Sequence, residues 1–136
     1  MIASINVNPS VIFSGDDMFI TLDVIESGGL DTDGSEITVI LPVDNRFSFT
    51  WDPSLVNGSI DNTIWTYDDS NPFIHRWTTT SVISANQTKS IGLDGYFDTQ
   101  NSDGTVASTM VILPGSGGET NGNNNTDTDI IIFFGL

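Results

Sequence analysis

The stretch from Met18 to Pro42, MFITLDVIESGGLDTDGSEITVILP, decides the fold expected for this chain. In its first part, one set of apolar residues falls at every second position, a pattern typical of a half-buried β-strand. The residues that share its apolar face are Met18, Ile20, Leu22 and Val24. After an acidic, glycine-containing turn, Ile37, Val39 and Leu41 alternate again, and Pro42 ends this second strand by removing a backbone donor. A two-stranded ribbon is marginal in water, so the rest of the chain must cover these apolar faces.

The composition is that of a folded, acidic domain. The 136 residues are 38% hydrophobic and 10% aromatic, enough for a single core, and the absence of cysteine excludes disulfides and thiolate metal sites. A formal charge of −15 argues against nucleic-acid binding, because phosphate contacts need clustered Lys and Arg, and disfavours anionic membranes. No apolar run approaches the roughly 20 residues that span a bilayer. The acidity serves either solubility or calcium binding.

Further strand-like segments surround this pair, with turn residues between them. They are two pieces within Ala3–Phe13, broken at Asn8-Pro9, and then residues 46–51, 63–68, 73–79, 88–97, 105–113 and 129–134. No helical period is sustained over ten or more residues, so we expect an all-β sandwich of eight or nine strands. We expect residues 114–128, rich in Gly and Asn, to form a long surface loop, because the apolar run DIIIFF at 129–134 demands burial.

Four segments carry a family resemblance through their order. They are ITLDVIESGG, TVILP, ISANQTKSIGL and GETNGNNNTDTDIIIFF. From about Ser10 onward the chain resembles the DUF11-like, immunoglobulin-like repeat domains of bacterial surface and secreted proteins, and DTDGSEITVILP is similar to repeats of Bacteroidota adhesins. The resemblance implies one domain over residues 1–136, an immunoglobulin-like antiparallel β-sandwich of about seven to nine strands, extracellular and usually in tandem. It supplies no catalytic residues, and the insert Asp52–Pro72 is longer and more aromatic than a minimal repeat.

Two acidic turns are candidate calcium sites. Residues 31–36, DTDGSE, place alternate carboxylates before a Gly and then an acid, as at the start of a calcium loop that takes hard oxygen ligands from alternate positions. The segment lacks the length and helices of an EF-hand, so an Asp-rich turn is the alternative. The second turn, residues 98–103, adds the amide of Asn101, and Asp127 with Asp129 forms a further candidate calcium site. The candidate Ca²⁺ ligands in the two turns are Asp31, Asp33, Glu36, Asp98 and Asp103.

The aromatic residues offer a second kind of site. Trp65 and Tyr67 lie beside polar turns and are the candidate ligand-binding residues, because exposed aromatic rings stack on sugars. Trp51 and Trp77 alternate with polar residues and are expected in the core. His75 is the only histidine and is expected as a packed side chain, so a catalytic triad and a zinc site are both disfavoured. Paired carboxylates for glycoside hydrolysis stay open.

The sequence therefore predicts a non-enzymatic extracellular module of a bacterial cell-surface protein, such as an adhesin stalk or repeat. A Met directly before a strand-like segment fits an excised piece of something longer or a small complete protein, and any export signal would lie outside the chain. One alternative is a carbohydrate-binding module that uses Trp65 and Tyr67. Another is a filament subunit in which DIIIFF or the N-terminal strand completes a neighbour's sheet. The expected partners are neighbouring repeats, other surface proteins or a glycan, without nucleic acid or membrane insertion.

Overall fold

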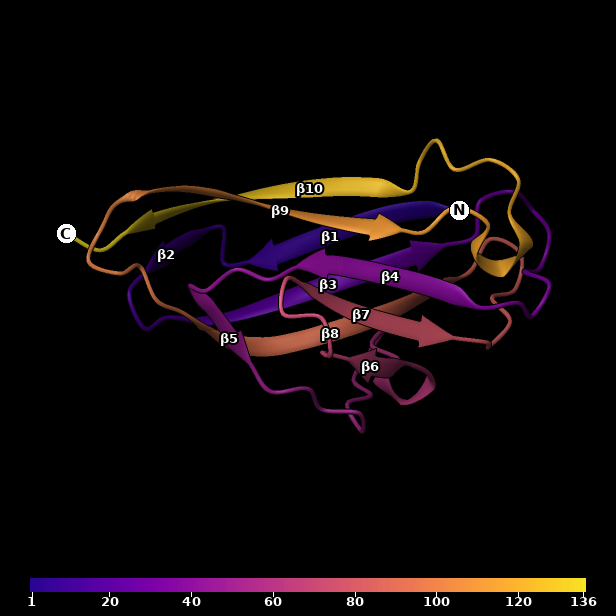
Figure 1. Ribbon diagram of the computed structural model, residues 1–136, viewed down its shortest axis with the longest axis horizontal. Helices are drawn as coiled ribbons and strands as arrows, with labels where there is room; N and C mark the ends of the chain where they lie inside the picture. Colours follow the sequence, from indigo (N-terminus) through magenta and orange to yellow (C-terminus); the bar gives the residue numbers. More distant parts are fainter.

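The computed structural model describes residues 1–136, and its strands form two packed β-sheets (Figure 1). The four-stranded sheet has the order β1-β3-β8-β5, and the six-stranded sheet has the order β2-β10-β9-β4-β7-β6. The ten strands are β1 (Ile2–Asn8), β2 (Val11–Phe13), β3 (Asp17–Ile25), β4 (Ile37–Pro42), β5 (Phe47–Phe49), β6 (Thr66–Asp68), β7 (Ile74–Thr79), β8 (Thr88–Phe97), β9 (Gly104–Ile112) and β10 (Thr126–Phe134). Two short 3₁₀ turns, η1 (Asn62–Ile64) and η2 (Ser116–Gly118), complete the secondary structure.

The two-sheet sandwich confirms the expected fold class. All strand pairs are antiparallel except β2 with β10, which is parallel. The strand count exceeds the expectation because three strands, β2, β5 and β6, have only three residues each. None of the helical segments is long and apolar enough to cross a membrane.

The strands of the Met18–Pro42 stretch contribute their predicted faces to the core. The apolar faces of β3 and β4 are at most 4% exposed and lie in a core cluster of 21 buried residues. The two strands do not pair with each other, however: β3 lies between β1 and β8, while β4 lies between β7 and β9 in the other sheet. The acidic turn therefore crosses from one sheet to the other, and the expected ribbon is wrong. Period-two burial identifies a strand's inner face but not its neighbour.

The last strand departs from the sequence prediction. It begins at Thr126, inside the expected loop of residues 114–128, and within that loop Ser116 and Gly117 are buried. The expected burial of the whole DIIIFF run is wrong, because only Ile131 and Phe133 face the core. Successive side chains of the strand alternate between its two faces, so the residues on either side of Ile131 and Phe133 lie on the outer face.

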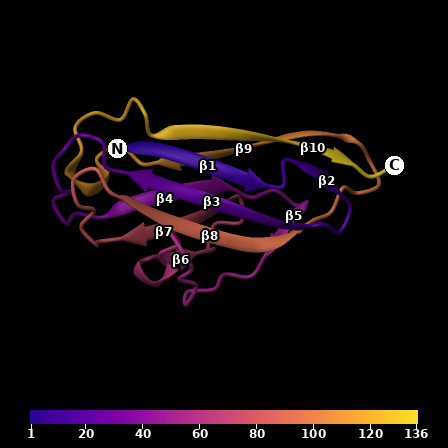
Figure 2. The same cartoon turned by 180° about the vertical axis from the view of Figure 1, so that it is seen from behind.

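The strands run along the long axis of the molecule, and the two ends of the chain lie apart along it (Figures 1 and 2). Both views show β1 and β10 running in the same direction, with Met1 near one end and the C-terminus at the other. Each strand has a complete antiparallel neighbour: β1 pairs with β3 along its whole length, and β10 pairs with β9 from Thr126 to Phe133.

Candidate functional site

Most carboxylates of this acidic chain are acceptors for the chain's own donors. All but three of the 18 accept an intramolecular hydrogen bond, mostly from backbone N–H groups. In five turns the carboxylate of an Asp accepts the N–H two residues ahead, as Asp side chains do in Asx turns. Two of these turns begin at Asp44 and Asp98, and the other three begin at Asp33, Asp52 and Asp68. Much of the negative charge therefore has a structural role.

The same hydrogen bonds favour the ionised carboxylates. The hydroxyl and N–H of Ser35 lower the pKa of Asp33 below its ordinary value of 3.8, and Ser54 lowers the pKa of Asp52 in the same way. The N–H of Ser70 is the largest cause of the lowered pKa of Asp68. Since each bond favours the charged form, these turns are best held when their carboxylates are ionised.

Glu26 is a buried example, only 7% exposed. Burial raises its pKa, but the N–H groups of Asn86, Gly28 and Gly29 lower it, and the net pKa lies below 4.5. The three N···O distances are 3.2, 2.7 and 3.1 Å. This carboxylate therefore ties the turn after β3 to the corner before β8.

Two strand edges are capped by side chains. On the free edge of β1, Ile5 N–H donates to Asp127 Oδ2 at 2.8 Å and Val7 N–H donates to Asp129 Oδ2 at 2.7 Å. On the part of β8 that β5 does not pair with, the fully buried Asn62 accepts from Gly92 N–H at 2.8 Å and donates to its carbonyl at 3.0 Å. Side-chain oxygens and an amide thus stand in for a missing neighbour strand, which closes these edges to another chain.

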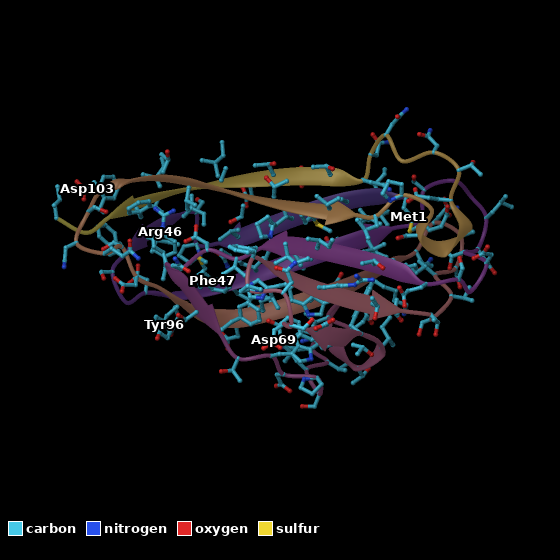
Figure 3. All side chains as sticks on the ribbon, viewed as in Figure 1. Met1, Arg46, Phe47, Asp69, Tyr96 and Asp103 are labelled. Atoms are coloured by element: carbon cyan, nitrogen blue, oxygen red, sulfur yellow. The ribbon has the colours of Figure 1, made fainter.

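The predicted calcium ligands are not brought into one group. The first set lies in the turn between β3 and β4, where Asp31 accepts from Ala85 N–H at 2.9 Å and Glu36 lies 3.6 Å from the Arg76 guanidinium. The second set lies at the opposite end of the sandwich, and Figure 3 shows Asp103 far from Met1.

Each of the five carboxylates is already an acceptor, and no group of three or more Asp, Glu, His or Cys side chains is arranged to hold a metal ion. Since Ca²⁺ takes six to eight oxygens, the arrangement fits backbone capping better than a preformed calcium site. The sequence-based expectation of calcium binding at Asp31, Asp33, Glu36, Asp98 and Asp103 is not tested by the structure.

The aromatic candidates lie in the interior rather than on a binding platform. Trp65 is 4% exposed, so its expected exposure is wrong: the turn η1 directs the ring into the core, where it cannot stack on a sugar. Tyr67 is half-buried, with its ring centroid 5.7 Å from that of Trp51 and 5.3 Å from that of Trp77. Trp77 is fully buried, as expected, whereas Trp51 is only partly buried.

Tyr67 and His75 form a neutral hydrogen-bonded pair beside this cluster. The Tyr67 Oη lies 2.7 Å from His75 Nδ1, and the His75 ring lies 4.8 Å from that of Phe49. Burial lowers the pKa of His75, with partial compensation by Asp69, and burial together with nearby carboxylates raises the pKa of Tyr67. Both shifts favour the uncharged forms of the two side chains. His75 is therefore a packed residue, as expected, and Tyr67 is its side-chain hydrogen-bond partner.

Three carboxylates accept no intramolecular hydrogen bond, and two of them mark a surface away from the aromatic cluster. They are Asp17, Asp69 and Asp94, and two of them line one shallow groove of about 420 Å³ on the four-stranded sheet. In the register of β3 and β8, Asp17 lies directly opposite Tyr96, and Asp94 is the next outward residue on β8. Tyr96 is 52% exposed and points away from the sandwich, and Asp69 lies elsewhere (Figure 3).

Sequence reasoning did not select this groove, although a signal was present. Tyr96 is the one large side chain that interrupts the apolar alternation of its strand. The groove is completed by three residues from β5 and its continuation and by Gly95, where a Cβ atom would collide with the Ser48 backbone. The residues that line it are Asp17, Ser48, Phe49, Thr50, Asp94, Gly95 and Tyr96.

Comparison with known proteins supports the fold. No family model and no curated protein sequence matches this chain. Its structure is similar to the CARDB domain of a Pyrococcus furiosus protein, crystallised in complex with di-metal ions, at a TM-score of 0.54 and 14% identity over 97% of this chain and 94% of that one.

The structure is also similar to about half of a chain that holds domains D2 and D3 of the major pilin SpaD from Corynebacterium diphtheriae, at a TM-score of 0.57 and 10% identity over 95% of this chain and 49% of that one. The full-length pilin matches at a TM-score of 0.51 and 10% identity, over 97% of this chain and 34% of the pilin. This chain therefore spans only part of the pilin. At such identities the likeness shows the fold, and it confirms an immunoglobulin-like β-sandwich.

Proposed function

We propose that this chain is a non-enzymatic, extracellular module of a bacterial cell-surface protein, serving as a spacer that bears tension between the segments on either side of it. The immunoglobulin-like sandwich and the resemblance of its motifs to bacterial surface repeats support this role. Most carboxylates hold turns and edges of the fold, which fits a structural module.

The direction of the two terminal strands is the observation that carries the proposal. Since β1 and β10 run the same way with the chain ends at opposite ends of the long axis, pulling the ends apart draws the two strands past each other (Figure 1). Three hydrogen bonds link β1 to β10 and the segment just before it. Ala3 N–H donates to the Asn124 carbonyl at 2.9 Å, and the N–H groups of Ile5 and Val7 donate to Asp127 and Asp129.

In this geometry a force that pulls the two ends of the chain apart acts on these hydrogen bonds all at once rather than one after another. The ladders that hold each terminal strand to its antiparallel neighbour, β1 to β3 and β10 to β9, are loaded along their length in the same way. Forced unfolding is governed by the unfolding rate, so bonds that must break together raise the force required.

The test is single-molecule force spectroscopy of the chain, pulled between its termini. We expect the double variant Asp127→Ala/Asp129→Ala to unfold at a clearly lower force than the unaltered chain. Asp61→Ala is the matched control, because Asp61 caps Ser90 N–H on β8, away from the terminal strands. The proposal is wrong if the two variants lower the unfolding force equally, or if the unaltered chain unfolds without a resolvable force peak.

An adhesive role at the Tyr96 groove is a second candidate. The exposed ring is suited to stack on a sugar, and the two carboxylates beside it, which have no hydrogen-bond partner within the chain, are suited to accept hydrogen bonds from the sugar hydroxyls. Saturation-transfer NMR with neutral oligosaccharides tests this role. Tyr96→Ala should abolish the transfer, while Phe73→Ala, which removes a ring that is 78% exposed elsewhere, should preserve it. Equal transfer in both variants would reject the groove.

A further inference from the structure

An apolar strip covers the outer face of the six-stranded sheet where β2 and β10 lie side by side. Its five side chains are between 44% and 60% exposed, and they are Val11, Phe13, Ile130, Ile132 and Phe134. In the parallel register Val11 lies opposite Ile132 and Phe13 lies opposite Phe134, with the two phenylalanine rings 5.9 Å apart. The strip is therefore continuous across the two strands.

The strip follows from the alternation of the two strands. Ile12, Ile131 and Phe133 point inward and are at most 3% exposed, which forces their neighbours onto the outer face. Along the rest of β10 and β9 the outer face is polar or small apart from the half-buried Val111, with Thr105, Ala107 and Thr128 exposed. A contiguous apolar surface of this kind is typical of an interaction site.

The other sheet edges near it offer no comparable surface. The free edge of β1 is capped by two carboxylates, and the part of β8 that β5 does not pair with is capped by Asp61 and Asn62. The strip differs from these edges because it is a sheet face: it lies beside β2, the edge strand of its sheet, whose Phe13 N–H donates to Asp16 Oδ2 at 2.9 Å. Strand addition at β1, one form of the filament hypothesis, is therefore disfavoured.

We propose that this strip is a self-association surface, on which a second copy of this domain packs its own β2 and β10. A buried aromatic side chain contributes roughly 150–250 Å², and the strip has two such side chains and three smaller aliphatic ones, so its half-exposed residues leave on the order of 400–500 Å² in water. Two copies facing each other would bury on the order of 1,000 Å², the lower limit for a specific interface. The area fits a weak isologous contact between copies and is too small for a permanent dimer.

The charge of the chain determines how this contact responds to salt. Each copy carries a formal charge of −15, and the strip itself contains no charged side chain. Repulsion between two copies is screened as ionic strength rises, while apolar burial is not weakened. Self-association should therefore strengthen with salt, whereas binding of a basic partner protein would weaken.

Sedimentation equilibrium of the whole chain, up to about 1 mM in 50 and 500 mM NaCl, tests the proposal. We expect a monomer–dimer equilibrium that is tighter at high salt, with a dissociation constant on the order of 0.1 mM. Phe13→Thr/Ile132→Thr should weaken it at least about tenfold. The matched control is Phe73→Thr/Leu30→Thr, which removes a phenylalanine and an aliphatic side chain that are each 78% exposed elsewhere.

Circular dichroism establishes that both double variants fold, and concentration-dependent amide shifts in β2 and β10 locate the contact. A chain that stays monomeric at 1 mM in 500 mM NaCl overturns the proposal and assigns the strip to a different protein. So does an equal loss of association in the two double variants, which would indicate non-specific apolar contact.

Discussion

Removal of the two carboxylates that cap β1 should destabilise the fold measurably. Asp127 and Asp129 accept from Ile5 and Val7 N–H groups more than 100 residues away in the chain, at 2.8 and 2.7 Å. Alanine at either position deletes the acceptor and leaves a part-buried N–H group at the strand edge. The expected effect is a loss of folding stability without loss of any apolar contact.

The magnitude follows from the type of bond. A hydrogen bond to a charged group contributes about 1.5–3 kcal/mol, and partial access of water to this edge favours the lower end. Each single variant should lose about 1.5 kcal/mol and the double variant about 3 kcal/mol. With a urea dependence of about 2 kcal/mol per molar, the unfolding midpoint should fall by about 0.7 M and 1.5 M respectively.

Urea unfolding followed by tryptophan fluorescence is the assay. The matched controls are Asp69→Ala and Asp94→Ala, which remove exposed carboxylates without a hydrogen-bond partner and should change stability by less than about 0.5 kcal/mol. Asp129→Asn keeps an acceptor oxygen and should fall between the alanine variant and the unaltered chain. If the alanine variants at Asp127 and Asp129 behave like the controls, the edge-capping argument is refuted.

Three further predictions concern the interior and the acidic turns. Burial lowers the pKa of His75, so the unfolded chain takes up a proton first: stability should be complete above pH 6.5 and decline as the pH falls towards the folded-state pKa. His75→Gln should flatten the change in urea midpoint between pH 7 and 5.5. Asn62→Ala should cost about 3 kcal/mol in urea unfolding, because it leaves Gly92 N–H and C=O buried without a partner, whereas the exposed Asn57→Ala should be neutral. Millimolar Ca²⁺ should barely move the thermal midpoint relative to a chelator, because the acidic turns are not grouped around a metal position; a rise of many degrees would show that they rearrange around one.

The sequence by itself determined the strands and their inner faces. The alternation of β3 and β4 is local, since successive side chains of a strand point to opposite faces, and a buried face needs apolar residues at every second position. The predictions for Met18 through Val24 on β3, and for Ile37 through Leu41 on β4, are confirmed for this reason. The absence of a helical period and the spacing of the turns were sufficient for the sandwich class.

Only the tertiary structure decided what lies beside each strand, because those contacts join residues far apart in the chain. It places β3 and β4 in different sheets, buries Trp65, and leaves Ile132 exposed beside β2. It also gives the acidic residues their roles: Asp127 caps a strand 122 residues away, whereas Asp94, equally acidic in the sequence, has no partner. The sequence shows that a carboxylate is present. Which N–H group lies within 3 Å of that carboxylate depends on how the two sheets pack.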